Sequence, residues 1–301
     1  MRSILTPDDL ADEEIDAILA RARALRAGTR VRREEGGRLL ALIFLEASLR
    51  TRVGFSAAAA RLGWQSTVVA ERRHSPVSMM ESWADTLRTV AGYADAIVAR
   101  PGQPLGPADS ASAAPCPLLN GGDTGPKAHH PSQALIDLFA IDELVGPVAG
   151  LRIAVVGDPR MRAARSLLSL LARRLPSALL FVADPEHLQE IDLPPTLGAR
   201  AEARSWAEIG EVDVVYVAGI PHQALPLARR DALLVTAERV AALPARCVLL
   251  SPMPVIDEMD DRARQDPRNR MFEQSDLGLY VRMALLEQMV AGASSAKVDC
   301  S

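Results

Sequence analysis

Aromatic residues and cysteines are scarce in this 301-residue chain, and long hydrophobic runs are absent from its sequence. Only 4% of the residues are aromatic, and the three cysteines, Cys116, Cys247 and Cys300, are odd in number and widely spaced. This usage is typical of free thiols in a reducing cytosol and not of a disulfide scaffold. No apolar stretch approaches the roughly 20 residues of a membrane span, and the N-terminus lacks a signal-peptide core. We therefore predict a cytoplasmic protein that makes no contact with a membrane.

The chain also lacks an excess of either charge. It has 34 Lys and Arg against 38 Asp and Glu, for a formal net charge of -4. This balance offers no broad basic face for nucleic acid, so a nucleic-acid partner is not expected. The cysteines show no metal-ligand spacing, and we expect no metal. Hydrophobic residues make up 49% of the chain, which at this length predicts a soluble globular protein of two domains.

The most informative stretch is Phe44 to Arg52, with the sequence Phe-Leu-Glu-Ala-Ser-Leu-Arg-Thr-Arg. An apolar run at residues 39–45 has strand length, and residues 53–62 have helical composition. The stretch between them should form a helix N-terminus, where unpaired N–H groups and the helix dipole attract anions. Four side chains suit phosphate oxygens: Ser48, Arg50, Thr51 and Arg52. Taken alone, they fit a phosphate site and an ordinary helix cap about equally well.

Strand-like and helical segments alternate along the rest of the chain. Further strands are expected at residues 65–70, 94–99, 117–120, 151–156, 178–183 and 212–217. Helices are expected from Thr6 to Leu25 and at residues 81–92, 131–139, 163–174 and 274–290. The segment of residues 101–117 is rich in Pro, Ala and Ser and is the only low-complexity piece of the sequence. This alternation predicts an α/β fold with two doubly wound parallel sheets.

The sequence Glu-Ala-Ser-Leu-Arg-Thr-Arg resembles the Ser-Thr-Arg-Thr-Arg phosphate-binding signature of aspartate and ornithine carbamoyltransferases, most closely the aspartate enzymes. Further blocks recur in family order, at residues 82–86 with 93–100, 119–123 with 130–133, 156–158, and 252–254 with 257–258. The resemblance covers about residues 5 to 290. It implies a carbamoyl-phosphate-binding domain at residues 1–145 and an acceptor-binding-like domain at 146–275. Two helices should cross between them, the second of which, at about residues 276–292, packs back on the first domain.

The resemblance implies carbamoyl transfer from carbamoyl phosphate to a small amine without any cofactor. Four residues would polarise the carbonyl group and so be catalytic: Arg50, Thr51, Arg100 and His130. Six more positions would bind the donor: Ser48, Leu49, Ser75, Gln133, Met253 and Pro254. Of these, Gln133 and the backbone carbonyls of Met253 and Pro254 would hold the carbamoyl amide. The loop around Ser75 would serve a neighbouring subunit, which implies a homotrimer with shared active sites.

Four positions on the acceptor side depart from the family pattern. Met79 replaces a lysine, and Ala163, Gly219 and Val255 replace arginines in the simplest alignment. Three arginines lie close to Ala163 in the sequence, and a small register change would restore a charge there: Arg160, Arg162 and Arg165. On the donor side only Leu49 departs, with the loss of a hydroxyl group. Losses concentrated on one side predict an acceptor other than ordinary aspartate.

Two other functions remain open on the sequence. The first is a catalytically silent homologue that acts as a phosphate-binding or structural partner protein. The second is a transferase that uses the same cradle for another phosphorylated or anionic donor. A dinucleotide site at Gly157 and Asp158 is disfavoured, because the segment lacks the three spaced glycines of that motif.

Overall fold

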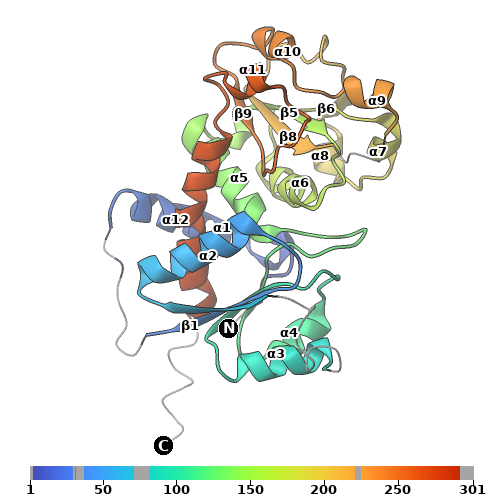
Figure 1. The fold of residues 1–301 in the computed structure, drawn as a ribbon. Coiled ribbons are helices and arrows are strands. Elements are labelled where there is room, and N and C mark those ends of the chain that lie inside the picture. Colours follow the sequence, from blue (N-terminus) through green and yellow to red (C-terminus); the bar gives the residue numbers. More distant parts are fainter. Residues whose placement is uncertain (1–2, 30, 32–36, 71–80, 221–224, 292–301) are drawn as a thin grey trace, which may run out of the picture. The chain divides into compact units, whose positions relative to one another are not determined.

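The computed structural model describes residues 3–29, 31, 37–70, 81–220 and 225–291. The chain divides into two compact units, one of residues 1–132 and 278–301 and the other of residues 133–277. Each unit contains its own parallel sheet (Figure 1). The division falls within helix α5 (Pro131–Leu144) and within helix α12 (Met271–Val290), so both helices pass from one unit into the other. The predicted α/β fold with two parallel sheets and two crossing helices is confirmed.

The first sheet has the strand order β2-β1-β3-β4. Its strands are β1 (Leu39–Phe44), β2 (Gln65–Ala70), β3 (Ala96–Arg100) and β4 (Leu118–Asn120), and all neighbours are parallel. The chain runs outward from β1 to β2 and then returns to place β3 on the other side of β1. The direction of winding therefore reverses between β1 and β3. In open α/β sheets, ligands bind beyond the carboxyl ends of the strands at such a switch point.

The helices of the first unit cover both faces of this sheet. Figure 1 shows α1 (Asp12–Arg26) and α2 (Leu49–Leu62) on one side, and α3 (Trp83–Ala91) and α4 (Pro107–Ala113) on the other. The buried residues of α1 lie at helical spacing along one face: Ile15, Ile18, Leu19, Ala22 and Leu25. Helix α4 was missed, because its Pro, Ala and Ser composition lacks apolar periodicity.

The first predicted helix starts later than expected. Residues Pro7–Asp9 form a separate 3₁₀ helix, η1, and α1 begins only at Asp12. The reason is local: the Asp9 carboxylate accepts hydrogen bonds from the backbone N–H groups of Leu5 and Thr6, at 2.7 and 2.8 Å. These hydrogen bonds stabilise the single turn of η1, and the extended backbone at Leu10 ends η1 before α1 begins.

The second sheet has the strand order β7-β6-β5-β8-β9, again with all neighbours parallel. The strands are β5 (Arg152–Gly157), β6 (Ala178–Val182), β7 (Ala201–Ala203), β8 (Val214–Gly219) and β9 (Val248–Leu250). Strands β5, β6 and β8 were predicted. Strands β7 and β9 were missed, because three residues are too few for a period-2 pattern to stand out. The switch point of this sheet lies between β5 and β8.

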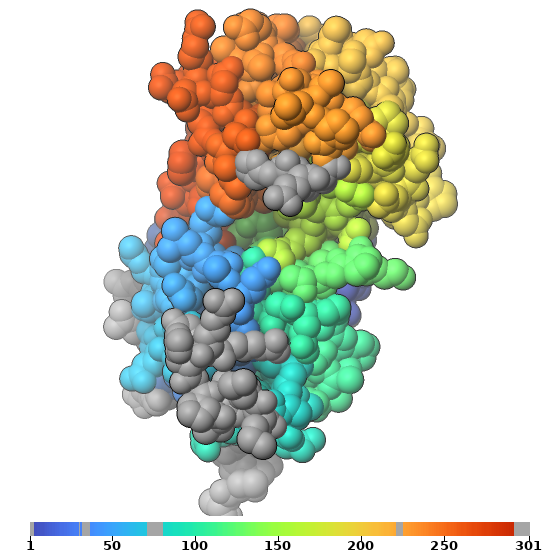
Figure 2. Space-filling view, turned by 45° about the vertical axis from the view of Figure 1, so that its right-hand side comes forward, coloured from blue at the N-terminus to red at the C-terminus, as the bar shows by residue number. Residues whose placement is uncertain are grey.

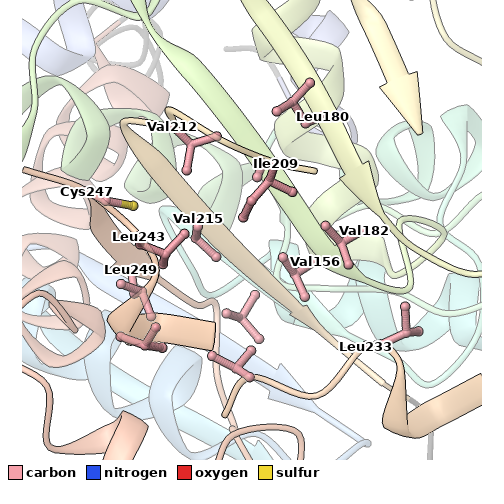
Figure 3. Close-up of a cluster of buried hydrophobic side chains, with 14 of the residues drawn as sticks. Val156, Leu180, Val182, Ile209, Val212, Val215, Leu233, Leu243, Cys247 and Leu249 are labelled. Carbon is pink, nitrogen blue, oxygen red and sulfur yellow. The ribbon is translucent and has the colours of Figure 1, made fainter. Parts of the chain in front are cut away.

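Short helices connect these strands, and apolar side chains pack against them. The helical elements are η2 (Val148–Gly150), α6 (Arg162–Arg174), α7 (Pro185–Gln189), α8 (Pro195–Gly198), α9 (Leu227–Asp231), α10 (Ala237–Ala241) and α11 (Asp261–Arg264). Figure 3 shows the buried cluster, in which Val156, Val182 and Val215 come from three neighbouring strands and Leu233 and Leu243 from the connecting segments. Within the described ranges, no helix combines the length and apolarity that crossing a membrane requires.

Candidate active site

Helix α2 begins directly after the turn that follows β1, as predicted. Ser48 occupies the N-cap position with extended backbone, and Leu49 and Arg50 are the first helical residues. The first turn of α2 contains no acidic residue, so its N-terminal N–H groups and positive dipole end are not neutralised from within the helix. The local sequence accounts for this geometry. A buried apolar strand leads to Ser48, and the segment that follows Ser48 is rich in alanine, which favours a helix.

Arg50 and Leu49 differ sharply in exposure. Arg50 is half-buried, and this burial lowers the pKa of its guanidinium from the ordinary value. An arginine nevertheless stays charged in proteins, so a cation is held at the start of α2. Leu49 is 69% exposed. Its side chain therefore extends towards solvent in the first unit.

Three predicted catalytic residues meet beyond the carboxyl ends of β1, β3 and β4. The Thr51 hydroxyl lies 3.3 Å from Nε2 of His130, and both residues are buried. A Cβ atom built on Gly122 would lie 2.9 Å from Cδ2 of His130 and 3.3 Å from Nη1 of Arg100. The imidazole and the guanidinium thus flank the same glycine. The structure brings Thr51, Arg100 and His130 together within one unit.

The strand register explains why Arg100 reaches this place. Phe44 pairs with Arg100 across β1 and β3, so the last residue of β3 lies level with the end of β1. The Arg100 guanidinium donates from Nε to the Glu46 carboxylate at 2.7 Å, and the arginine side chain is only 11% exposed. This ion pair restrains the guanidinium beside the start of α2.

The loop from β4 to α5 positions His130. Asp123 is buried and accepts hydrogen bonds from the backbone N–H groups of Leu105 and His129, at 3.0 and 2.7 Å. His130 Nδ1 lies 3.3 Å from the Ser132 hydroxyl. With a partner near each ring nitrogen, the imidazole is held in one orientation. This arrangement can present a neutral imidazole as a donor to a carbonyl oxygen.

Gln133 and the Ser251 to Pro254 turn lie in the second unit. Gln133 donates from Nε2 to the Asp137 carboxylate at 2.7 Å. The turn follows β9, and Met253 has left-handed backbone with φ 54° before a cis bond to Pro254. The N–H group of Met253 donates to the Ser251 hydroxyl at 3.1 Å. The hydrogen bond from Met253 to Ser251 and the left-handed backbone at Met253 define the shape of the turn.

The acceptor positions of the second unit carry no charge of their own. Ala163 is 9% exposed in α6, and Val255 is packed against the hydrophobic cluster of Figure 3. Gly219 ends β8 with φ 91°, and the nearest atom to a Cβ built there would be Oε1 of Glu258, at 3.8 Å. Ser75 and Met79 lie outside the described residues.

Of the three arginines near Ala163, Arg160 is held by carboxylates. Its guanidinium donates to both carboxylate oxygens of Asp158 at 2.9 Å and to Glu190 at 2.8 Å. The hydrogen bonds to Asp158, followed by those to Glu190, raise the pKa of Arg160 above its ordinary value. Two carboxylates therefore pair with the Arg160 guanidinium.

Comparisons with known proteins agree with this geometry. Residues 2–143 match the family model described as "Aspartate/ornithine carbamoyltransferase, carbamoyl-P binding domain". The aspartate carbamoyltransferase catalytic subunit of Methanosphaerula palustris is 33% identical to this chain, over 97% of the chain and 100% of the relative. The chain belongs to the aspartate/ornithine carbamoyltransferase family. A chloroplastic aspartate carbamoyltransferase of Oryza sativa is also 33% identical, over 97% of this chain and 83% of that relative.

Solved carbamoyltransferase structures share the whole fold. The catalytic subunit of M. jannaschii aspartate transcarbamoylase superimposes with a TM-score of 0.84 and 30% identity, over 98% of this chain and 100% of that one. A Trypanosoma cruzi aspartate transcarbamoylase solved with carbamoyl phosphate has a TM-score of 0.81 and 27% identity, over 95% and 94% of the two chains. Ornithine carbamoyltransferase from Pyrococcus furiosus, at 24% identity, is similar in fold, with a TM-score of 0.80 over 97% of each chain.

Sequence reasoning missed three features of this carbamoyltransferase-like site. Glu46 pairs with Arg100, Gly122 lies against His130, and Asp137 binds Gln133. Of these, only the spacing of Gln133 and Asp137 carried a local signal, because residues four apart face each other on a helix. The first two contacts depend on which strands are neighbours.

Proposed function

We propose that this family member transfers the carbamoyl group of carbamoyl phosphate to a small amine that is less anionic than aspartate. The observation that carries the proposal is the meeting of Thr51, Arg100 and His130 around Gly122, next to the start of α2. Charged and neutral donors that converge on one point beyond a sheet's switch point suit an anionic, carbonyl-containing ligand. Relatives from Trypanosoma cruzi were solved with carbamoyl phosphate and with phosphate, which supports the same donor here.

The phosphate group would bind at the start of α2. The first backbone N–H groups of the helix, at Leu49 and Arg50, and the Ser48 hydroxyl are donors suited to its oxygens. A backbone N–H group does not depend on the side chain, so the replacement of a hydroxyl residue by Leu49 removes only one donor. The Arg50 guanidinium adds a charge-assisted contact at the edge of this cradle.

The reaction itself would be an acyl transfer. The lone pair of the amine attacks the carbonyl carbon, and Arg100, Thr51 and His130 donate hydrogen bonds to the oxygen on which negative charge develops. The bond from carbon to the phosphate oxygen then breaks, phosphate leaves with the electron pair, and the amine loses one proton. Gln133 and the backbone carbonyls of Met253 and Pro254 are assigned to the carbamoyl NH₂ group. No organic cofactor or metal enters these steps.

The acceptor is inferred from the second unit. Gly219, Ala163 and Val255 offer no cation to a carboxylate, and Arg160 is engaged by Asp158 and Glu190. Among the residues that the structure describes, the side chain nearest to a Cβ atom built on Gly219 is the carboxylate of Glu258. Losing a bidentate arginine opposite a carboxylate costs about 2–5 kcal/mol, which is enough to prevent ordinary aspartate binding. A neutral or cationic amine avoids this cost.

A homotrimer is part of the proposal. Four large apolar side chains on α2 and the edge strand β2 are exposed, and such exposure favours contact with another subunit: Leu49, Val53, Val68 and Val69. In the space-filling view, this part of the chain contributes to the blue surface (Figure 2). A mass of three chains in light scattering is the expected result, and a monomer would contradict the sharing of active sites.

Calorimetric titration with carbamoyl phosphate tests the donor, and product analysis tests the acceptor. We expect carbamoyl phosphate to bind more tightly than inorganic phosphate, followed by carbamoylation of at least one member of an amine panel in mass spectrometry. Absence of binding at millimolar donor would overturn the proposed function. Binding without turnover over a broad panel would favour a catalytically silent homologue. Efficient carbamoylation of aspartate would refute the inference about the acceptor alone.

A further inference from the structure

Asp137 is a fully buried carboxylate in α5 that binds three side chains distant from one another in the sequence. It accepts hydrogen bonds from the Tyr216 hydroxyl at 2.7 Å, from Nε2 of Gln274 at 2.6 Å and from Nε2 of Gln133 at 2.7 Å. Burial, and then the negative charge of Asp137, raises the pKa of Tyr216 well above its ordinary value. Tyr216 therefore stays protonated and acts as a donor. All these residues belong to the second unit.

A carboxylate that only accepts hydrogen bonds determines the orientation of both glutamine amides. Each must turn its NH₂ group towards Asp137 and its carbonyl oxygen away from it. For Gln274 the other end confirms this orientation, because its Oε1 accepts a hydrogen bond from the backbone N–H of Ser251 at 2.9 Å, and a backbone N–H can only donate. For Gln133 the same constraint leaves Oε1 as the amide atom that is not bound to Asp137 and can accept a hydrogen bond. Such an acceptor is the group that an amide N–H donor requires.

The contact with Gln274 extends the network to a second site element. Ser251 is the first residue of the turn that contains Met253 and Pro254, and its hydroxyl accepts from the Met253 N–H. A continuous path of hydrogen bonds thus leads from Asp137 through Gln274 and Ser251 to Met253. The two elements assigned to the carbamoyl amide, namely Gln133 and this turn, are anchored to one buried carboxylate.

We propose that Asp137 is a positioning residue for recognition of the carbamoyl NH₂ group. It turns the Gln133 oxygen away from its own carboxylate and holds the Met253 turn, and it does not itself touch the ligand. The inference rests on the proposed function, since it assumes that carbamoyl phosphate is the ligand. A positioning role predicts that loss of Asp137 weakens the binding of carbamoyl phosphate but not of inorganic phosphate, whereas a purely structural role predicts no such difference. Inorganic phosphate has no N–H group, so its affinity should not depend on Asp137.

The test compares the affinities of carbamoyl phosphate and inorganic phosphate in the full chain by calorimetry. Asp137→Ala should weaken carbamoyl phosphate binding about tenfold, while phosphate affinity changes less than about twofold. Asp137→Asn should restore affinity to within about threefold of the wild type, because its amide oxygen can face both glutamines while the Tyr216 hydroxyl rotates to accept. The matched control is Asp184→Ala, which removes another buried carboxylate of the same unit and should leave the ratio of affinities unchanged.

Three results would overturn the assignment of Asp137. One is an equal loss of affinity for both ligands in Asp137→Ala, another is no loss in the folded variant, and a third is an Asn variant as weak as the Ala variant. If Asp137→Ala fails to fold, Gln274→Met keeps the carboxylate and cuts only its link to Ser251. That variant should also lose carbamoyl phosphate affinity selectively, and an unchanged ratio would refute the network. Failure of the proposed function is distinguishable, because the wild type itself would then not prefer carbamoyl phosphate to phosphate.

Discussion

Replacing Gly122 by alanine should disrupt donor binding at a modest cost in stability. Gly122 is buried and has φ 104°, and an added Cβ would lie 2.9 Å from Cδ2 and 3.2 Å from Nε2 of His130. Cβ atoms do not normally approach another heavy atom this closely, so the imidazole must move. It is buried and lies between Thr51 and Ser132, so movement lengthens a 3.3 Å contact to one of them.

The Gly122→Ala substitution has two separate effects, one on the free energy of unfolding and one on carbamoyl phosphate binding. An alanine in left-handed backbone costs about 1–2 kcal/mol of unfolding free energy, whatever space surrounds it. The added Cβ atom displaces His130 and would also lie only 3.3 Å from Nη1 of Arg100. Movement of these side chains removes hydrogen bonds to the ligand. Hydrogen bonds that involve charged groups contribute about 1.5–3 kcal/mol each, so carbamoyl phosphate binding should weaken about 10- to 100-fold.

Gly28→Ala separates these effects. Gly28 has φ 88°, and among the described residues no heavy atom lies within 4 Å of its added Cβ. Urea unfolding should show losses of about 1–2 kcal/mol for both variants. Calorimetry with carbamoyl phosphate should show weakened binding for Gly122→Ala only. The reasoning is refuted if Gly122→Ala binds carbamoyl phosphate like the wild type, or if Gly28→Ala loses affinity to the same extent.

Three further predictions concern single side chains. Arg50→Ala should abolish measurable carbamoyl phosphate binding in calorimetry with little change in Tm, whereas Arg61→Ala, at the other end of the same helix, should bind normally. Hydrogen bonds from Arg229 lower the pKa of Asp184, so its contribution to stability is present above about pH 4 and is lost as the pH falls through the folded-state value. The difference in unfolding free energy between the wild type and Asp184→Asn should therefore be constant near neutral pH and shrink in acid; a difference that grows in acid would contradict this. Burial raises the pKa of Cys247 to about 12, so iodoacetamide at pH 8 should leave it unmodified in the native protein and alkylate it in urea, as read by peptide mass spectrometry.

Local pattern was sufficient for most helices and long strands. The turn from β1 into α2 was predicted because an apolar run, a capping serine and a helix-forming segment follow one another within about 20 residues. The apolar residues that α1 buries are likewise spaced along the sequence at helical intervals. Where local pattern was weak, prediction failed: α4 has no apolar stripe, and η1 closes through the single side chain of Asp9.

For the candidate site, the sequence predicted residues but not their geometry. Family resemblance named Arg100 and His130, yet their contacts with Glu46 and Gly122 had no counterpart in the sequence pattern. The charge near Ala163 is a further case. Arg160 is close to Ala163 in sequence, but only the structure shows that its guanidinium contacts the carboxylates of Asp158 and Glu190.

The sequence by itself determined the longer strands and helices, and that a helix start suited to an anion follows the first long strand. Those properties depend on neighbours along the chain, whose hydrogen bonds and side-chain spacing are read directly from residue order. Only the tertiary structure decided that Thr51 meets His130 across 79 positions and that Gln274 meets Asp137 across 137. Such pairs follow from the strand order and from the packing of the crossing helices. Many orders bury the same apolar faces equally well, so the pattern of apolar residues does not select among them.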